Sequence, residues 1–255
     1  TSCSEEEEST TPAASSENSS GDTDSGGDTT TSISVCSSTA SGTITGIDNQ
    51  SLSGTYNIMK QYPVDGMDNS TGCTSSSTLL SVFSSYIATG AGSFIYYRVI
   101  TSSTSFATVL KSFTDSACSS EMASLVIGNN NVSIGDNVTG LTTGSGSIGT
   151  TGTKVTSVDY CMAGKGTTDN GTAWLNSYVG GDTTFTTGEE KIAQSSGAKK
   201  YHLWHTDNSS KRFNSSLSGY ENYSGNVWRD RASSSSYPTD WTDMDGGSLD
   251  GFQDN

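Results

Sequence analysis

The sequence predicts an all-β protein, an antiparallel β-barrel or sandwich, and three observations lead to that prediction. Ser, Thr and Gly account for 114 of the 255 residues, and hydrophobic residues make up only 31%. Short stretches rich in Val, Ile, Thr, Tyr and Phe recur with turn residues between them, which is typical of strands. Leu, Ala, Glu and Lys form few periodic arrays, which argues against a helical bundle. No apolar run is long enough to cross a bilayer as a helix.

Residues 1–32 are predicted to be a disordered acidic linker. They hold eight acidic residues, no Lys or Arg, and none of the larger apolar or aromatic residues. Such a segment cannot bury enough apolar surface to offset the entropy that it would lose on ordering.

Cys3 stands near the start of this linker and is the predicted site of lipidation. Thr1-Ser2-Cys3 resembles the last three positions of a bacterial lipobox, in which the cysteine is acylated. Ser4 and the run Glu5–Glu8 resemble signals that route lipoproteins to the outer membrane or the cell surface. We therefore expect a secreted, lipid-anchored protein, with an incidental thiol in a linker as the alternative.

A single β domain is expected over residues 33–235, followed by an acidic tail over residues 236–255. Ser93–Ile100 is almost continuously apolar, so it should be a central strand that is buried on both faces. Turn residues such as Asn170-Gly171, which suits a tight turn, separate the strands. The predicted strands are Gly42–Ile47, Leu52–Lys60, Leu79–Ile87, Ser93–Ile100, Ser105–Phe113, Met122–Ile127, Asn131–Ile134, Thr153–Met162, Thr183–Thr187, Lys200–Thr206 and Gly225–Arg229.

The segment Thr78–Ala88 carries competing signals. Leu79, Phe83 and Ile87 have the spacing of one helix face. The Ser and β-branched content of the segment nevertheless favours a strand, and a helix stays open as the alternative.

Four cysteines remain for disulfides once Cys3 is set aside. None forms a CxxC pair or has a histidine close in sequence, which argues against zinc. The secreted composition indicates two disulfides, although four cysteines allow three connectivities. We favour nested pairing, with Cys73–Cys118 inside Cys36–Cys161, and one bridge with two free cysteines stays open.

Several motifs in the first half of the domain follow one another in an order that resembles a known protein family. Leu52–Tyr56 looks like the opening Gly-x-Trp strand of lipocalin-like domains, with Tyr56 in place of Trp. Cys73 follows this strand, and an aromatic strand then leads to Asp115-Ser-Ala-Cys118. A Gly-rich hairpin and an apolar strand that holds an Asp come next. Over Gly42–Met162 the chain thus resembles a group of bacterial secreted lipoproteins with lipocalin-like barrels, which implies a barrel fold and a place on the cell envelope.

No pattern in the sequence indicates a catalytic centre, and we expect a non-enzymatic protein. Residues 144–149 match GxGxxG, but without a strand–helix context in a Gly-rich chain the match means little. His202 and His205 are three residues apart, so on a strand they face opposite sides and would not share a metal. A Ser-His-Asp triad stays open, because Ser and Asp are abundant and nothing singles out one set.

Calcium is the one metal that the sequence suggests, and no other cofactor is expected. The C-terminal stretch combines acidic residues with glycines, which suits the oxygen ligands and flexible turns of a calcium site. The EF-hand spacing fails, however, so a solvated acidic tail is the favoured interpretation. The candidate ligands are Asp243, Asp245, Asp250 and Asp254.

Aromatic residues are the other candidates for a binding site. The chain has four Trp and eleven Tyr. Trp174, Trp204 and Tyr96 are the candidates to contact a small apolar ligand or a glycan. Aromatic residues in a chain this poor in apolar residues are more often core, and that interpretation is favoured.

The favoured function is that of a cell-surface binding protein. The net charge of −15 argues against a nucleic-acid partner, because phosphate binding needs a basic face. A lipocalin-like barrel on the bacterial outer membrane or cell surface would bind a small ligand or serve the envelope, and its lipid anchor would contact the membrane. The alternative is a structural subunit of an extracellular coat, adhesin or filament that assembles with itself. A secreted hydrolase is the third possibility.

Overall fold

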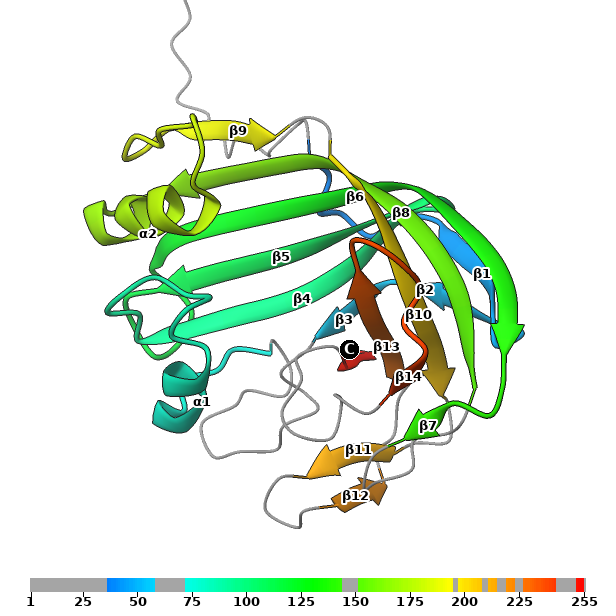
Figure 1. Ribbon diagram of the computed structural model, residues 1–255. Helices are drawn as coiled ribbons and strands as arrows, with labels where there is room; N and C mark the ends of the chain where they lie inside the picture. Colours follow the sequence, from blue (N-terminus) through cyan, green and yellow to red (C-terminus); the bar gives the residue numbers. More distant parts are fainter. Residues whose placement is uncertain are drawn as a thin grey trace, which may run out of the picture. The chain divides into compact units, whose positions relative to one another are not determined.

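The computed structural model describes residues 36–57, 72–143, 151–194, 197–207, 211–214, 219–222, 227–241 and 251–254 (Figure 1). All of them belong to the unit that extends from Ile33 to Asn255. The predicted linker, residues 1–32, lies outside the described residues. No helix within the described ranges is long and apolar enough to cross a membrane.

Strongly curled antiparallel strands dominate the fold, which confirms the predicted all-β class. Four long strands lie side by side in chain order (Figure 1), and each pairs with the next. The predicted strands Met122–Ile127 and Asn131–Ile134 are two parts of one strand, because the backbone at Asn131, with a φ of 51°, interrupts the alternation without ending the pairing. The four strands are β4 (Ser93–Ser102), β5 (Ser105–Phe113), β6 (Glu121–Val138) and β8 (Gly152–Gly166).

The sheet closes on itself through four further strands. β10 (Lys199–Asp207) pairs with β8 on one side and with β13 (Val227–Ser233) on the other. β13 pairs with β15 (Gly251–Asp254), β15 pairs with β3 (Thr55–Asn57), and β3 pairs with β4. Within the described residues, every strand of this nine-stranded sheet except β9 therefore belongs to a closed ring of antiparallel pairs. A ring in which each strand pairs with its neighbour along the chain is the topology of an up-and-down barrel.

The remaining strands lie outside this ring. β1 (Thr43–Ile47) and β2 (Gln50–Ser53) form one hairpin, and β11 (Lys211–Asn214) and β12 (Gly219–Asn222) form another. β9 (Glu190–Gln194) pairs with the C-terminal part of β8. β7 (Thr142–Thr143) pairs in parallel with β14 (Asp240–Trp241).

Two stretches of the predicted acidic tail are strands, namely β14 and β15. Trp241 in β14 is buried, and its indole N–H donates a hydrogen bond to the carbonyl oxygen of Thr151 at 3.1 Å. β15 supplies the pairings that close the ring. The sheet therefore extends beyond the boundary expected at residue 235. The acidic composition of the tail does not show that β14 and β15 pair with strands of the domain.

The predicted strand over Thr78–Ala88 is wrong, because helix α1 spans Ser77–Val82. Leu79 on the helix, Phe83 at its C-terminal end and Ile87 beyond it are all buried and belong to one hydrophobic cluster. Burial of these three side chains outweighs the weak helix propensity of the Ser and β-branched residues around them.

Helix α2 (Asp169–Val179) occupies the position of the predicted tight turn at Asn170-Gly171. The side chain of Thr168 accepts a hydrogen bond from the N–H of Gly171 at 3.1 Å, so it caps and starts the helix. The predicted strand Thr183–Thr187 is likewise not a strand. Its backbone bonds instead to the side chain of Asn176 on α2, which holds it against the helix.

Both disulfides of the predicted nested pattern are present. Cys36 pairs with Cys161, and Cys73 pairs with Cys118. Cys36 and Cys161 are buried in a cluster with Val99 of β4 and other small side chains of the sheet. This bridge therefore ties the segment before β1 to strand β8.

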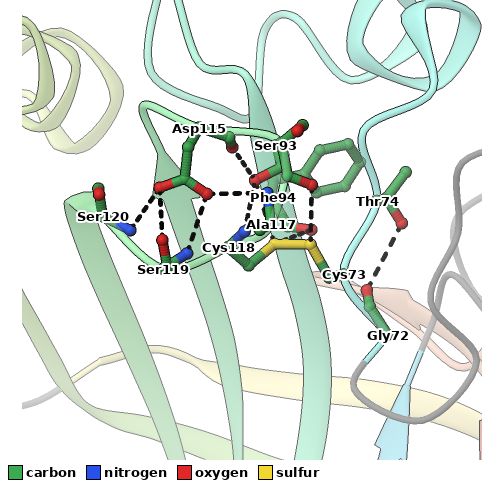
Figure 2. The surroundings of a disulfide bond; sticks show 11 residues. Gly72, Cys73, Thr74, Ser93, Phe94, Asp115, Ala117, Cys118, Ser119 and Ser120 are labelled. Carbon is green, nitrogen blue, oxygen red and sulfur yellow. Dashed lines mark hydrogen bonds between the residues drawn. A yellow bond between two sulfur atoms is a disulfide. The ribbon is translucent and has the colours of Figure 1, made fainter.

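Figure 2 shows the second disulfide and the turn that positions it. The carboxylate of Asp115 accepts hydrogen bonds from the backbone N–H groups of Ala117, Ser119 and Ser120, between 2.7 and 3.1 Å. Hydrogen bonds to the charged form, led by that of Ser119, lower the pKa of Asp115 well below its ordinary value. Cys118 lies inside this turn with a φ of 54°, so the turn fixes the sulfur that bonds to Cys73.

Candidate functional site

Side chains along the ring alternate between an inner and an outer face. On β4, Phe94, Tyr96 and Ile100 pack with a large cluster that includes Trp204. The intervening Val99 packs with the buried cysteines on the opposite side of the strand. We call the side that carries Phe94 and Trp204 the inner face.

A chain of hydrogen bonds crosses the inner face. Arg98 on β4 bonds through Nη1 to Oδ2 of Asp230 on β13. The other carboxylate oxygen of Asp230 is 2.9 Å from Nδ1 of His202, and Nε2 of His202 is 2.7 Å from Oγ of Ser157. The hydroxyl of Ser157 also donates to Oδ1 of Asn129 at 3.2 Å. We call these five residues the polar relay.

The polar relay is almost completely removed from solvent. The side chain of Asp230 is 0% exposed and that of His202 is 3% exposed, whereas that of Arg98 is 12% exposed. Burial raises the pKa of Asp230, but attraction to His202 and Arg98 and their hydrogen bonds outweigh it and bring the pKa to about 2. Asp230 is therefore an ionised carboxylate at neutral pH.

Aromatic rings surround the relay. Trp204 and Trp228 meet edge to face with their centroids 4.8 Å apart, and Phe106 lies 5.4 Å from the first and 5.5 Å from the second. The guanidinium of Arg98 lies 5.5 Å from the ring of Phe106 and 5.3 Å from that of Trp228. These rings exclude water and lower the local dielectric, which strengthens both the ion pair and the cation–π contacts.

One row of residues on the inner face is only partly covered. The register places Arg98 opposite Thr108, Thr108 opposite Ile127, and Ile127 opposite Met162, on four neighbouring strands. We call these four residues the inner row. Arg98, Ile127 and Met162 are half-buried, as is Tyr96, two positions before Arg98. Arg98 contacts the rings of the aromatic cluster, whereas Ile127 and Met162 pack against the cluster under α2, and all three keep partial exposure.

Part of the polar relay has the connectivity of a Ser-His-Asp triad, which the sequence alone did not single out. In such a triad the histidine takes the serine proton through Nε2 and is oriented by the carboxylate through Nδ1. Ser157, His202 and Asp230 bind one another through these atoms. However, Ser157 is 0% exposed, and its hydroxyl also bonds to Asn129. The relay as it stands stabilises a buried charge and does not present a nucleophile to a substrate.

His205 forms a separate contact, as its spacing from His202 predicts. Nδ1 of His205 is 2.7 Å from Oδ2 of Asp48, and its ring meets that of Trp241 at 6.3 Å. No group of three or more His, Cys, Asp or Glu residues in the described part of the chain could hold a metal ion.

The structure does not bring the three predicted ligand-binding aromatic residues together. Trp204 is completely buried in the aromatic cluster. Trp174 is buried on α2, in the other cluster, and its ring lies 5.4 Å from that of Tyr178. Tyr96 packs against both clusters beside the inner row. Of the three, Tyr96 is therefore the one next to the partly exposed part of the inner face.

Most of the other predicted site residues lie outside the described ranges. They are Cys3, the predicted lipidation site, and three predicted calcium ligands, Asp243, Asp245 and Asp250. The fourth predicted calcium ligand, Asp254, lies in β15, where it pairs with Tyr56.

Sequence reasoning named only His202 of the polar relay and missed its other four members, Arg98, Asn129, Ser157 and Asp230. A usable signal exists for Asp230, because it lies two positions after Trp228 on a strand, and alternate residues share a face. An acidic residue on the same face as a core tryptophan needs a buried partner. No comparable signal marks Ser157 in a chain so rich in serine.

The fold and the site together define a disulfide-bonded, antiparallel β protein with a charged relay inside a ring of strands. No protein-family model matches the sequence, and no curated protein matches it. The function is therefore argued from the residues themselves.

Proposed function

We propose that the protein is a non-enzymatic, secreted and lipid-anchored protein of a bacterial outer membrane or cell surface. Its lipocalin-like domain binds one small ligand at the inner row. The observation that carries ligand binding is the partial exposure of Arg98, Ile127 and Met162, which lie along one row of the inner face. A ring of about eight strands has an interior that side chains fill or that holds one small ligand. Apolar side chains with a few placed polar groups are the usual lining of such sites.

The two disulfides support a secreted location, because disulfides form and persist in oxidising compartments. The lipid anchor rests on Cys3 and the residues around it. Mass spectrometry of the N-terminal peptide from the full-length protein, made in a bacterium with its native leader, tests the anchor. We expect acylated Cys3 and a membrane-bound protein, and we expect Cys3→Ala to move the protein to the soluble fraction. Unmodified Cys3 in the wild-type protein would contradict the anchor.

Native mass spectrometry of the protein purified from its own host tests ligand binding. We expect a small molecule to co-purify with the folded protein. Ile127→Trp should fill the inner row and lower the occupancy at least tenfold, with a thermal melt to show that the variant folds. Ile192→Trp is the matched control, because Ile192 is 41% exposed on β9. Equal ligand occupancy in Ile127→Trp and Ile192→Trp would show that the ligand does not bind at the inner row.

A secreted hydrolase is the second candidate function, because Ser157, His202 and Asp230 are connected as in a catalytic triad. A small fluorophosphonate, which modifies activated serines, distinguishes the two functions. Modification of Ser157 that is lost in His202→Ala would favour a hydrolase. An unmodified Ser157 in the folded protein would leave the relay as a structural network and favour the binding function.

A further inference from the structure

We infer that the outer face of β8, β10 and β13 binds an acidic glycan, a polysaccharide whose sugar rings carry carboxylates. This surface lies on the opposite side of the sheet from the inner row, so the inference does not depend on the proposed ligand of that row. It follows from two lysines that have no acidic neighbour and from two tyrosines that link them. We call these four residues, Lys154, Lys199, Tyr201 and Tyr237, the outer cluster.

The strand register places the outer cluster on one face of the sheet. Lys199 and Tyr201 alternate on β10 with His202, which belongs to the polar relay of the inner face, so both point outwards. On the neighbouring strand β8, Lys154 precedes Val155, which packs in the large cluster of the inner face, so Lys154 also points outwards. The ring of Tyr237, in the segment after β13, meets that of Tyr201 edge to face at 5.1 Å. The outer cluster therefore joins β8, β10 and the segment that follows β13.

Lys154 and Lys199 differ from the other lysines whose side chains the structure describes. Within the described residues, neither of the two lies within ion-pair distance of a carboxylate, although acidic residues outnumber basic ones by 27 to 12 in the chain. Two such lysines on one face leave a local positive charge on an acidic molecule. The other described lysines each have an acidic neighbour, in the pairs Lys111–Glu121, Lys191–Glu189, Lys200–Asp159 and, across the strand register, Lys165–Glu190.

The charges around the outer cluster do not cancel its positive charge. The carboxylate of Asp240, beside the cluster, is bound by Arg231 of β13. Six of the twelve Lys and Arg residues of the chain lie between positions 199 and 231, with only three acidic residues among them. Exposed charges are screened over about 8 Å at physiological ionic strength, so nearby charges matter more here than the net charge of −15. An anionic group is therefore attracted to this face.

The two tyrosines supply a surface that a sugar ring fits. The ammonium group of Lys154 lies 5.4 Å from the centre of the Tyr237 ring, and that of Lys199 lies 5.2 Å from the centre of the Tyr201 ring. The outer cluster is thus a row of two rings with a cation at each end. Both rings are half-buried, so packing restrains them while part of each stays exposed. A tyrosine ring packs against the C–H face of a sugar, and its hydroxyl bonds to sugar hydroxyls.

A membrane surface fits this face less well than a glycan does. Binding to anionic lipids combines basic residues with apolar side chains that enter the head-group region. The large apolar side chains that are exposed in the described part of the chain are Val82, Tyr86 and Ile192, and none of them lies on β8, β10 or β13. The outer cluster offers charges and aromatic rings, and an acidic glycan uses both.

Three probes test the inference on the full-length wild-type protein. Calorimetry measures the binding of polygalacturonate, of its methyl ester and of polyglutamate. The methyl ester keeps the sugar rings without the charge, and polyglutamate keeps the charge without sugar rings. We expect polygalacturonate to bind at least tenfold more tightly than either of the others. Equal binding of polyglutamate, equal binding of the methyl ester, or no binding of polygalacturonate would each overturn the inference.

Paired charge variants locate the binding surface. Lys154→Gln/Lys199→Gln should lower the affinity for polygalacturonate at least tenfold, because it removes both cations of the outer cluster. Lys111→Gln/Lys191→Gln is the matched control, since it removes the same charge from lysines that have acidic partners. The control should stay within twofold of the wild type. An equal loss in the two double variants would show that net charge governs the binding and would overturn the assignment to the outer cluster.

Tyr237→Leu tests the part played by the rings. The variant keeps every charge, and its affinity for polygalacturonate should fall at least fivefold, with a thermal melt to show that it folds. An unchanged affinity would leave only an attraction between charges and overturn the assignment to a sugar.

Vesicles of phosphatidylglycerol and phosphatidylcholine distinguish a membrane from a glycan. The wild type and Lys154→Gln/Lys199→Gln should bind these vesicles equally. Vesicle binding that is lost in the double variant would assign this face to a membrane and overturn the inference.

Discussion

Arg98 and His202 come from different strands and bind the two oxygens of one carboxylate, that of Asp230. A fully buried carboxylate is stable only when partners of this kind compensate for its lost hydration. The positions of β4, β10 and β13 are therefore linked through one side chain. The first three predictions concern this carboxylate and a second one, that of Asp115 in the turn of Figure 2.

Asp230→Asn should be strongly destabilising, because Arg98 and His202 would lose the charge that both of them contact. Breaking a buried ion pair by removing one partner costs about 3–5 kcal/mol in the free energy of unfolding. Urea denaturation monitored by tryptophan fluorescence measures this loss. Asp136→Asn is the control, since Asp136 is exposed on β6. A loss no larger than that of the control would show that the relay contributes little to stability.

Stability should fall when the pH drops below the ordinary pKa of aspartate, about 4. Asp115 and Asp230 both have folded-state pKa values below that value, and for Asp230 it is about 2. A group with a lowered pKa stabilises the fold above its unfolded pKa, and the contribution is lost as the pH falls through the folded pKa. Thermal melts between pH 7 and pH 2 should therefore show a progressive loss.

Asp115→Asn distinguishes the contribution of Asp115 to the pH dependence of stability from that of Asp230. The variant should melt below the wild type at pH 7, because the turn around Cys118 loses a charged acceptor. The difference should narrow as the pH falls and the wild-type carboxyl is protonated. A difference that stays constant from pH 7 to pH 2 would show that the charge of Asp115 is not what stabilises the turn.

Gly171→Ala should destabilise the protein although Ala favours helices. A Cβ atom at this position would lie 2.0 Å from the carbonyl oxygen of Met122, a backbone atom of β6. The clash should outweigh the gain of about 1 kcal/mol in helix propensity, since overpacking costs about 1–3 kcal/mol. Asn170→Ala, at the neighbouring exposed position, is the control in chemical denaturation. A more stable Gly171→Ala would contradict the close approach of α2 and β6.

Loss of the Cys36–Cys161 bridge should cost more than loss of Cys73–Cys118. The bridges join residues 125 and 45 positions apart, and the chain-entropy model gives about 5 and about 4 kcal/mol for loops of these sizes. Pairwise Cys→Ser variants, compared by denaturation, measure the two contributions. The reverse order would mean that packing around the sulfurs outweighs chain entropy.

The sequence predicts the strands well where alternation or a long apolar run accompanies burial. Ser93–Ile100 and Ser105–Phe113 are found almost as predicted, because they lie in the middle of the sheet. The helix α1 is missed because the prediction gave the Ser and β-branched content of the segment more weight than the spacing of Leu79, Phe83 and Ile87, which are buried in a shared cluster.

The site is less predictable than the fold. Trp204 is recognisable as an important residue, but its role as core depends on Trp228 and Phe106, which lie on other strands. The contact between Ser157 and His202 exists only because β8 pairs with β10. Contacts between such distant segments produce no recognisable residue spacing in a single sequence. The disulfides are easier to predict, because cysteine residues indicate disulfide bonds by their identity alone.

The closure between β3 and β15 also has a kinetic consequence. Tyr56 pairs with Asp254, about 200 positions further along the chain, and the entropy lost in closing a loop grows with its length. Contacts this distant slow folding. The Cys36–Cys161 bridge shortens the covalent path between the two strands, so a chain that has formed it searches a smaller space before the ring closes. Oxidation before closure should therefore speed the last step of folding, and reduced protein should refold more slowly.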